Sequence, residues 1–171
     1  MQDIYERARQ IRVAIFDVDG ILTDGTLYYG ESGEELKVFN VLDGHGMRML
    51  QDEGVALAII SSRSSRCVET RARNFGIELL YQGTHDKLAA FGDLLERCAV
   101  AAGACAYVGD DVVDLPVMKR CGLAFSVPDA PAVVRREAHY VTRARGGRGA
   151  AREVCEIILH SRASRPRALL S

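Results

Sequence analysis

The sequence lacks any apolar run long enough to cross a membrane, since its longest hydrophobic stretches have the length of a strand or of one helix face. Its first ten residues, MQDIYERARQ, are charged and precede no apolar signal region, so we expect neither export nor a membrane span. It also lacks a charge imbalance, because 22 basic and 23 acidic residues give a formal net charge of −1. No global field therefore favours nucleic acid or an acidic membrane, and an anionic ligand must be met by local basic groups.

Cysteine pairs at metal-binding or disulfide-scaffold spacing are absent as well. The five cysteines are odd in number, widely spaced and mostly set in apolar surroundings: Cys67, Cys98, Cys105, Cys121 and Cys155. We expect buried free thiols, which are typical of a cytoplasmic protein. The sequence shows no internal repeat at solenoid periods.

The sequence does contain strand-length apolar runs that alternate with helical patterns, as in an α/β protein. Its 171 residues, 48% hydrophobic and 26% charged, predict a single domain with an ample core. Strand-length apolar runs occur at 13–16, 55–60, 104–108, 123–127 and 139–141, and helical patterns at 43–53, 64–75, 86–101, 112–120 and 130–137. Continuous hydrophobicity is typical of strands that are buried on both faces. We therefore predict a doubly wound, Rossmann-like parallel sheet.

Two segments depart from this alternation. Residues 26–40, TLYYGESGEELKVFN, have two β-prone arms around a Gly/Ser/Glu turn, and we predict a hairpin flap beside the carboxyl end of the first strand. The tail at 143–171 combines a Gly/Arg loop at 143–149, a helix at about 150–160 and a basic end that we expect to be disordered.

The stretch VAIFDVDGILTDG, residues 13–25, places two carboxylates directly after the first strand. Like charges this close disfavour each other's ionisation unless a cation or a shared proton lies between them. On its own such a pair is more often a capped turn or a solvated pair. Asp17 and Asp19 are therefore informative only together with the other sites along the chain.

Those other sites also fall at or near strand ends. They are Ser61 after the second strand, Lys87 at the start of a helix, and Asp110, Asp111 and Asp114 in GDDVVD after the strand at 104–108. In open α/β sheets, ligands bind outside the carboxyl ends of the strands, so these side chains can converge. Less specific interpretations stay open: Lys87 as an exposed helix lysine, and the last two aspartates as the opening of the next helix.

The residue types suit phosphoryl transfer. Carboxylates from two strand ends form a hard oxygen site for Mg²⁺. With the cation in place, Asp17 can attack phosphorus while Asp19 donates a proton to the leaving oxygen and then takes one from water. Lys87 would balance charge, and the Ser61 hydroxyl with nearby N–H groups would hold the phosphate oxygens.

In their order and strand context, these motifs resemble the four motifs of the haloacid dehalogenase superfamily of phosphohydrolases. A finer resemblance covers nearly the whole chain: FDVDGILTDG, DGHGM, YVGDDVVDLPVM and GGRGAARE are similar to the small, capless 3-deoxy-D-manno-octulosonate 8-phosphate phosphatases. That resemblance implies Mg²⁺-dependent hydrolysis of a phosphorylated eight-carbon sugar acid in lipopolysaccharide biosynthesis, by a homotetramer.

The resemblance also implies roles for individual residues. Asp17 is the nucleophile and a metal ligand, Asp19 the general acid/base and backbone metal ligand, and Asp110 the other carboxylate ligand. Asp111 and Asp114 would hold the metal ligands and the lysine in place without coordinating the metal themselves. The second motif departs from the family's usual Thr-Gly-Arg, since this chain has Ser61, Ser62 and Arg63, and Ser62 lacks glycine's backbone freedom.

Three functions remain to be weighed: a phosphatase for a small sugar acid phosphate, one for a macromolecular phosphate, and a non-catalytic binding subunit. The last is the weakest because all four chemical positions are occupied. Arg63 favours the eight-carbon substrate over a related nine-carbon one, because the nine-carbon branch resembles this chain but has an acidic residue there.

The site needs closing by something other than a cap domain. Only 43 residues separate Asp17 from Ser61 and 25 separate Ser61 from Lys87, and core elements fill both gaps. Arg143, Arg145 and Arg148 suit bidentate recognition of a carboxylate, although they could equally be a solvated basic tail. We therefore expect association of subunits, with the Gly/Arg segment reaching a neighbouring subunit's site and reading the sugar acid.

Overall fold

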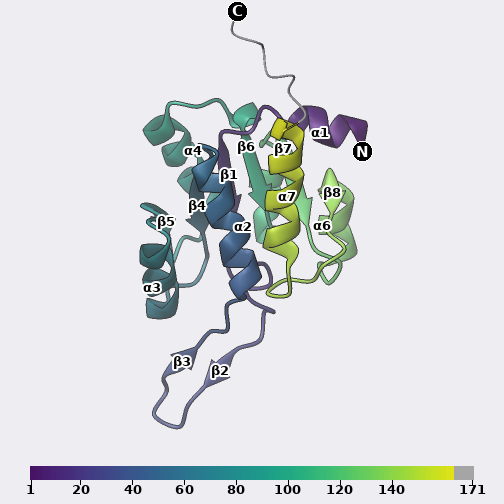
Figure 1. Ribbon diagram of the computed structural model, residues 1–171. Helices are drawn as coiled ribbons and strands as arrows, with labels where there is room; N and C mark the ends of the chain where they lie inside the picture. Colours follow the sequence, from purple (N-terminus) through teal and green to yellow (C-terminus); the bar gives the residue numbers. More distant parts are fainter. Residues whose placement is uncertain (164–171) are drawn as a thin grey trace, which may run out of the picture.

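A six-stranded parallel sheet forms the middle layer of the molecule (Figure 1). The structure is a computed structural model and describes residues 1–163. Across the sheet the strands run in the order β5 (Leu79–Tyr81), β4 (Ala56–Ile60), β1 (Val13–Phe16), β6 (Cys105–Val108), β7 (Leu123–Ser126) and β8 (Tyr140–Val141). Every neighbouring pair is parallel, so all six carboxyl ends lie on one edge. The predicted doubly wound α/β fold is confirmed.

Helices cover both faces of this sheet. Strands β1, β6 and β7 are buried at every position, which explains their uninterrupted hydrophobicity. The helices are α1 (Gln2–Ala8), α2 (Val41–Asp52), α3 (Arg66–Asn74), α4 (Lys87–Cys98), α5 (Leu115–Met118), α6 (Ala132–Glu137) and α7 (Ala150–Ala163), with short 3₁₀ turns at Ala102–Ala104 and Val112–Asp114. Figure 1 shows α2 and α7 side by side in front of the sheet, and α1 also packs against α7.

The flap is the one part that leaves this layered body. Strands β2 (Tyr28–Tyr29) and β3 (Glu35–Leu36) pair antiparallel, and the hairpin extends beyond the carboxyl edge of the sheet (Figure 1). The hairpin predicted for residues 26–40 is confirmed, although its paired strands are short. Between β1 and β6 the described residues contain no further domain, and the predicted capless architecture is confirmed.

The Gly/Arg segment packs closely against the loop that follows β1. The Gly147 N–H donates to the Ile21 carbonyl at 2.9 Å, and a Cβ on Gly146 would lie 1.7 Å from the Gly20 carbonyl oxygen. Residues 143–149 thus contact residues 20–24 of their own chain, and their reach into a neighbouring subunit's site stays a prediction that subunit mixing tests. Disorder was predicted for the basic end, of which residues 164–171 lie outside the described residues.

After this loop, α7 is a core helix rather than an appendage. The helix packs against α2 and α1. Its buried residues are Ala150, Ala151, Val154, Cys155, Ile157, Ile158 and Ser161. All five cysteines are free thiols, three of them buried and two partly buried. Within residues 1–163, no helix has the length and apolarity that crossing a bilayer requires.

Candidate active site

The predicted strand-end residues meet at the carboxyl edge of the sheet. Asp17 directly follows β1, Ser61 follows β4, and Asp110 follows β6 after one glycine. A cavity of about 260 Å³ opens there, lined by Asp17, Asp19, Gly25, Ser61, Ser62, Arg63, Asp110, Asp111 and Val113. Because β4, β1 and β6 are neighbours in the sheet, the topology alone brings these side chains together.

Lys87 lies beneath this cavity and pairs with two carboxylates. Its Nζ is 2.8 Å from Asp17 Oδ2 and 2.7 Å from Asp114 Oδ1, and its side chain is 2% exposed. Asp86 places it at the start of α4 by accepting a hydrogen bond from the Ala89 N–H. Burial alone would lower the pKa of Lys87, but the two carboxylates outweigh burial and raise that pKa. The lysine is therefore a fixed cation, not an exposed helix residue.

Asp114 organises the residues behind the cavity. Its Oδ1 accepts hydrogen bonds from Lys87 and from the hydroxyl of Tyr107, a buried residue of β6, both at 2.7 Å. Its Oδ2 accepts from the backbone N–H groups of Asp110 and Asp111 at 2.9 and 3.0 Å. Asp114 thus fixes both the lysine and the loop that carries Asp110. Sequence reasoning missed Tyr107, which is embedded in an apolar strand.

The Asp111 side chain, unlike that of Asp114, caps a turn and does not bind Lys87. Its Oδ1 accepts from the Val112 N–H at 2.7 Å in a capping box with Asp114. Asp111 thus opens the 3₁₀ turn, which is the alternative interpretation of the sequence. Its predicted support of the lysine is not part of this arrangement.

Three carboxylates form a cluster that could hold a metal ion. Asp17, Asp110 and Asp114 each offer an oxygen within 4.8 Å of the others. Burial, then the neighbouring carboxylates, raise the pKa of Asp17 to about 7 and that of Asp110 to about 8. Lys87 alone does not offset these charges, so the hard oxygen set fits a divalent cation such as Mg²⁺.

Gly20 allows this cluster to form. Its φ is +87°, and a Cβ at this position would lie 2.0 Å from Asp110 Oδ2. Glycine in the DVDG motif therefore supplies both the left-handed backbone and the space for the Asp110 carboxylate.

The loop after β4 is built around the Ser61 hydroxyl. Ser61 is buried, and its Oγ accepts a hydrogen bond from the Arg63 N–H at 3.3 Å. Within residues 1–163, Ala99 is the only non-glycine with a positive φ, so Ser62 adopts a conformation open to any residue. The serine that replaces the usual glycine is accommodated without backbone strain.

Asp19 turns its side chain away from the acidic cluster and toward the flap. Lys37, just after β3, donates a hydrogen bond from Nζ to Asp19 Oδ1. Arg63 Nε lies 3.7 Å from Asp19 Oδ2. The Arg63 guanidinium also donates to Glu35 Oε1 at 3.0 Å and to the Tyr29 hydroxyl at 2.9 Å. These flap contacts were not predicted, because no sequence pattern specifies them.

The three tail arginines lie outside the Asp17 cavity. Arg145 pairs with Asp129 at 3.3 Å and Arg148 with Asp24 at 3.8 Å, and both side chains are 71% exposed. These two line a second cavity of about 420 Å³ together with Gly20, Asp24, Gly25, Asp110, Val127, Asp129 and Gly146, so it shares Asp110 with the first. Arg143 is exposed, and its backbone N–H donates to the Glu153 carboxylate.

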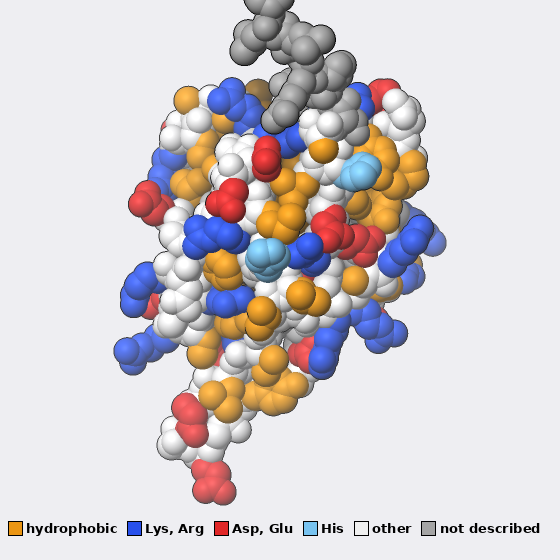
Figure 2. Space-filling model, in the orientation of Figure 1, with side chains coloured by type: hydrophobic (Ala, Val, Ile, Leu, Met, Phe, Trp, Pro, Cys, Tyr) orange, Lys and Arg blue, Asp and Glu red, His pale blue; other side chains and the backbone are white. Residues whose placement is uncertain are grey.

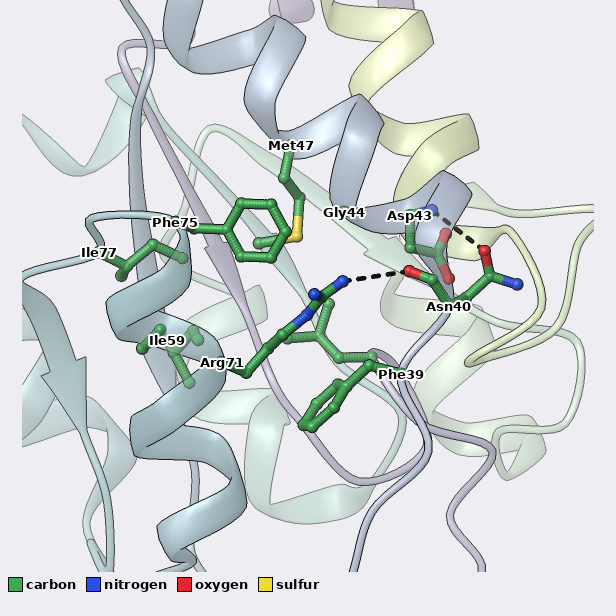
Figure 3. Close-up of a pocket in the computed structure, with 11 residues that line it drawn as sticks. Phe39, Asn40, Asp43, Gly44, Met47, Ile59, Arg71, Phe75 and Ile77 are labelled. Atoms are coloured by element: carbon green, nitrogen blue, oxygen red, sulfur yellow. Dashed lines mark hydrogen bonds between the residues drawn. The ribbon is translucent and has the colours of Figure 1, made fainter.

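Arg71 anchors the base of the flap in a small pocket beneath α2 (Figure 3). Its guanidinium lies 4.4 Å from the ring centroid of Phe75 and 5.6 Å from that of Phe39, and it donates to the Asn40 carbonyl. A Cβ on Gly44 would lie 2.5 Å from this guanidinium. These side chains fill the pocket, and their contacts fix the position of the chain between the hairpin and the start of α2.

A parallel sheet whose carboxyl edge carries a lysine-paired aspartate, a second aspartate two residues later, a serine loop and an acidic cluster defines a hydrolase of the haloacid dehalogenase type. Comparison with known proteins identifies one family within that class. The chain is 50% identical over 157 residues to 3-deoxy-D-manno-octulosonate 8-phosphate phosphatase KdsC of Escherichia coli K12, covering 92% of this chain and 84% of the relative. No protein-family model matches. The chain belongs to the 3-deoxy-D-manno-octulosonate 8-phosphate phosphatase family, whose members are phosphoric monoester hydrolases.

Solved structures agree with this assignment. The phosphatase of Moraxella catarrhalis, solved with magnesium ion, phosphate ion and KDO, superposes with a TM-score of 0.93 at 42% identity over 95% of this chain and 94% of that one. A haloacid dehalogenase superfamily hydrolase of subfamily III A from Legionella pneumophila superposes with a TM-score of 0.94 at 38% identity, over 95% and 90%. The capless fold and the family are therefore established by both comparisons.

Proposed function

We propose that this protein hydrolyses 3-deoxy-D-manno-octulosonate 8-phosphate to the free sugar acid and phosphate, a step of lipopolysaccharide biosynthesis. The observation that carries the proposal is the 2.8 Å pair of Asp17 and Lys87 at the base of an acidic cluster, in a chain half identical to an enzyme named for that reaction. The Lys87 ammonium opposes the rise in the Asp17 pKa and orients the carboxylate where a phosphoryl group would enter.

Mg²⁺ is the cofactor of this proposal. Asp17 and Asp110 would hold it with carboxylate oxygens, and Asp19 would add its backbone carbonyl. When bound, the ion neutralises the clustered negative charge and acts as a Lewis acid toward a phosphoryl oxygen.

In the first half-reaction, an Asp17 carboxylate oxygen attacks phosphorus, and the bond between phosphorus and the sugar oxygen breaks. Asp17 Oδ1 accepts from the Val18 N–H at 2.7 Å and Oδ2 from Lys87, which together fix the carboxylate. Asp19 donates its proton to the departing sugar oxygen. The products are the free sugar acid and an aspartyl phosphate on Asp17.

In the second half-reaction, the Asp19 carboxylate removes a proton from water as that water attacks phosphorus. The bond between phosphorus and Asp17 breaks, inorganic phosphate leaves, and Asp19 is again protonated. Ser61 and the backbone N–H groups around Ser62 would hold the phosphoryl oxygens throughout. Arg63, at the mouth of the cavity, would meet the sugar acid.

The carboxylate end of the substrate would reach the second cavity. Arg145 and Arg148 line it and suit bidentate carboxylate binding. Because that cavity shares Asp110 with the Asp17 cavity, one extended ligand could contact both. The recognition proposed here is made within one chain.

Assembly as a cytoplasmic homotetramer is part of the same proposal. Figure 2 shows hydrophobic side chains gathered at the base of the flap. The exposed apolar residues of the flap and its base are Leu27, Tyr28, Tyr29, Leu36, Val38, Val41 and Leu42. An apolar surface of this kind favours contact between copies of the chain. Five free thiols suit a reducing compartment. Light scattering after size exclusion measures the number of subunits.

Phosphate release tests the function. Purified protein with Mg²⁺ is offered the eight-carbon sugar acid phosphate, a nine-carbon analogue and a phosphopeptide, with Asp17→Asn as the control for contaminating phosphatase. We expect the highest kcat/KM on the eight-carbon substrate and no turnover by the variant. A preference for either other substrate would replace the proposed function by that alternative.

A further inference from the structure

The flap carries a buried lysine into the active site. Lys37 follows β3, and its side chain is 2% exposed although the residue as a whole is only partly buried and its neighbours Leu36 and Val38 are exposed. A buried ammonium is costly unless counter-charges pair with it. Its nearest counter-charges are Asp19, the acid–base residue of the proposed reaction, and Glu35 on the flap.

Two cations and two anions alternate around this contact. Lys37 Nζ bonds Asp19 Oδ1 and lies 3.4 Å from Glu35 Oε1. Arg63 completes the ring, since it lies 3.0 Å from Glu35 Oε1 and 3.7 Å from Asp19 Oδ2. The Arg63 side chain is 43% exposed, so Lys37 is the more firmly held cation and the closer one to Asp19.

The contact with Lys37 determines the direction in which the Asp19 carboxylate points. An aspartate that turned toward the acidic cluster would add a fourth carboxylate there and could no longer reach the leaving oxygen. The hydrogen bond from Lys37 holds it on the flap side of the cavity instead.

We propose that Lys37 is a positioning residue, which holds Asp19 ready for its two proton transfers and makes those transfers depend on the place of the flap. This inference rests on the proposed function for the role of Asp19. Lys37 does not line the Asp17 cavity, so nucleophilic attack by Asp17 does not require it.

The test separates the two half-reactions. With 2,4-dinitrophenyl phosphate the leaving group departs as a stable anion and needs no proton, whereas breakdown of the aspartyl phosphate still needs Asp19. Lys37→Met should therefore give a rapid burst of about one dinitrophenolate per active site, followed by turnover roughly 10- to 100-fold below wild type. On the sugar acid phosphate the same variant should lose kcat by a similar factor with little change in KM.

Matched variants keep the result interpretable. Lys119→Met also removes a lysine, but an exposed one 4.0 Å from Glu137, and should behave as wild type. Lys37→Arg restores a cation and should recover part of the rate. In a double-mutant cycle, Lys37→Met on top of Asp19→Asn should cost no more than Asp19→Asn alone, because the lysine acts through that carboxylate.

Several outcomes would overturn the proposal. These are wild-type turnover by Lys37→Met, loss of the burst together with steady-state turnover in a folded variant, or full additivity in the cycle. If Lys37→Met does not fold, a Lys37→Arg enzyme without any slowing of aspartyl phosphate breakdown overturns it equally. A wild-type enzyme that hydrolyses dinitrophenyl phosphate but not the sugar acid phosphate refutes the proposed substrate alone and leaves the burst test of Lys37 intact.

Discussion

The hydroxyl of Tyr107 donates a hydrogen bond to Asp114 Oδ1 at 2.7 Å, from the middle of a buried strand to the carboxylate that also binds Lys87. Tyr107→Phe deletes that donor in a site closed to water. We expect a loss of about 1–3 kcal/mol in the free energy of unfolding, the usual cost of leaving a buried charged acceptor short of a partner. Urea unfolding followed by circular dichroism measures it.

A surface tyrosine offers the matched control for this change. The Tyr81 hydroxyl bonds the Asp93 carboxylate at 2.6 Å on the exposed side of the molecule. Tyr81→Phe should change the free energy of unfolding by less than about 0.5 kcal/mol, since water replaces the lost partner. Equal effects of the two substitutions would contradict a special role for Tyr107.

Mg²⁺ should stabilise the protein more at high pH than at low pH. Burial and neighbouring carboxylates raise the pKa of Asp17 to about 7 and of Asp110 to about 8, so the folded, metal-free protein holds these protons more tightly than the unfolded chain. Its free energy of unfolding therefore falls as pH rises from about 4 toward 8. A cation favours the ionised carboxylates and reverses that loss.

Thermal melts with and without Mg²⁺ check this prediction at about pH 6 and about pH 8.5, on either side of the raised pKa values. The increase in Tm on adding the ion should be larger at the higher pH. Asp110→Asn should remove most of that pH dependence. An increase in Tm that is the same at both pH values would show that protons and the ion do not compete for these carboxylates.

Gly20→Ala should abolish Mg²⁺ binding and turnover. A Cβ there would lie 2.0 Å from Asp110 Oδ2, so the carboxylate must move out of the cluster. Gly54→Ala separates this effect from backbone strain, because Gly54 has a φ of +77° and open space around its Cβ position. That control should lose about 1 kcal/mol of stability and keep its activity. Isothermal titration with Mg²⁺ distinguishes the two, and normal affinity in Gly20→Ala would refute the steric argument.

The sequence could predict the catalytic edge because parallel strands bring their carboxyl ends together. Asp17, Ser61 and Asp110 each follow a continuous apolar run, and the sheet places those runs side by side. The β5 strand was missed because it has only three, partly buried residues. Helix α1 was missed too, since a seven-residue helix depends on packing against α7 rather than on its own propensity.

Pairings between distant side chains were beyond prediction. Lys37 and Asp19 are 18 residues apart, and Tyr107 is an apolar strand residue in every respect but its hydroxyl. The contacts of the Gly/Arg loop within its own chain were not predicted for a related reason. Gly146 and Gly147 provide close contact with the backbone of residues 20–24, and no sequence pattern specifies which backbone they approach.

Docking of this loop on its own chain leads to the last prediction, that Arg145 and Arg148 serve the site of their own subunit. They line the cavity that includes Asp110 of the same chain. Arg145→Gln together with Arg148→Gln should lower kcat/KM for the sugar acid phosphate by at least tenfold and leave hydrolysis of a small aryl phosphate nearly unchanged. Deletion after Val141 would be a poor test, because it removes the core helix α7.

Mixing two inactive chains shows whether Arg145 and Arg148 act in the active site of their own subunit or in that of a neighbouring subunit. One chain carries Asp17→Asn with both arginines intact, and the other carries the double arginine substitution with Asp17 intact. If the loop acts on its own subunit, no site in a mixed oligomer has both the nucleophile and the arginines. Activity on the sugar acid phosphate should then stay at the level of the unmixed chains after subunit exchange. Recovery toward wild-type activity would mean that the loop acts across the interface despite its contacts with Ile21 and Gly20.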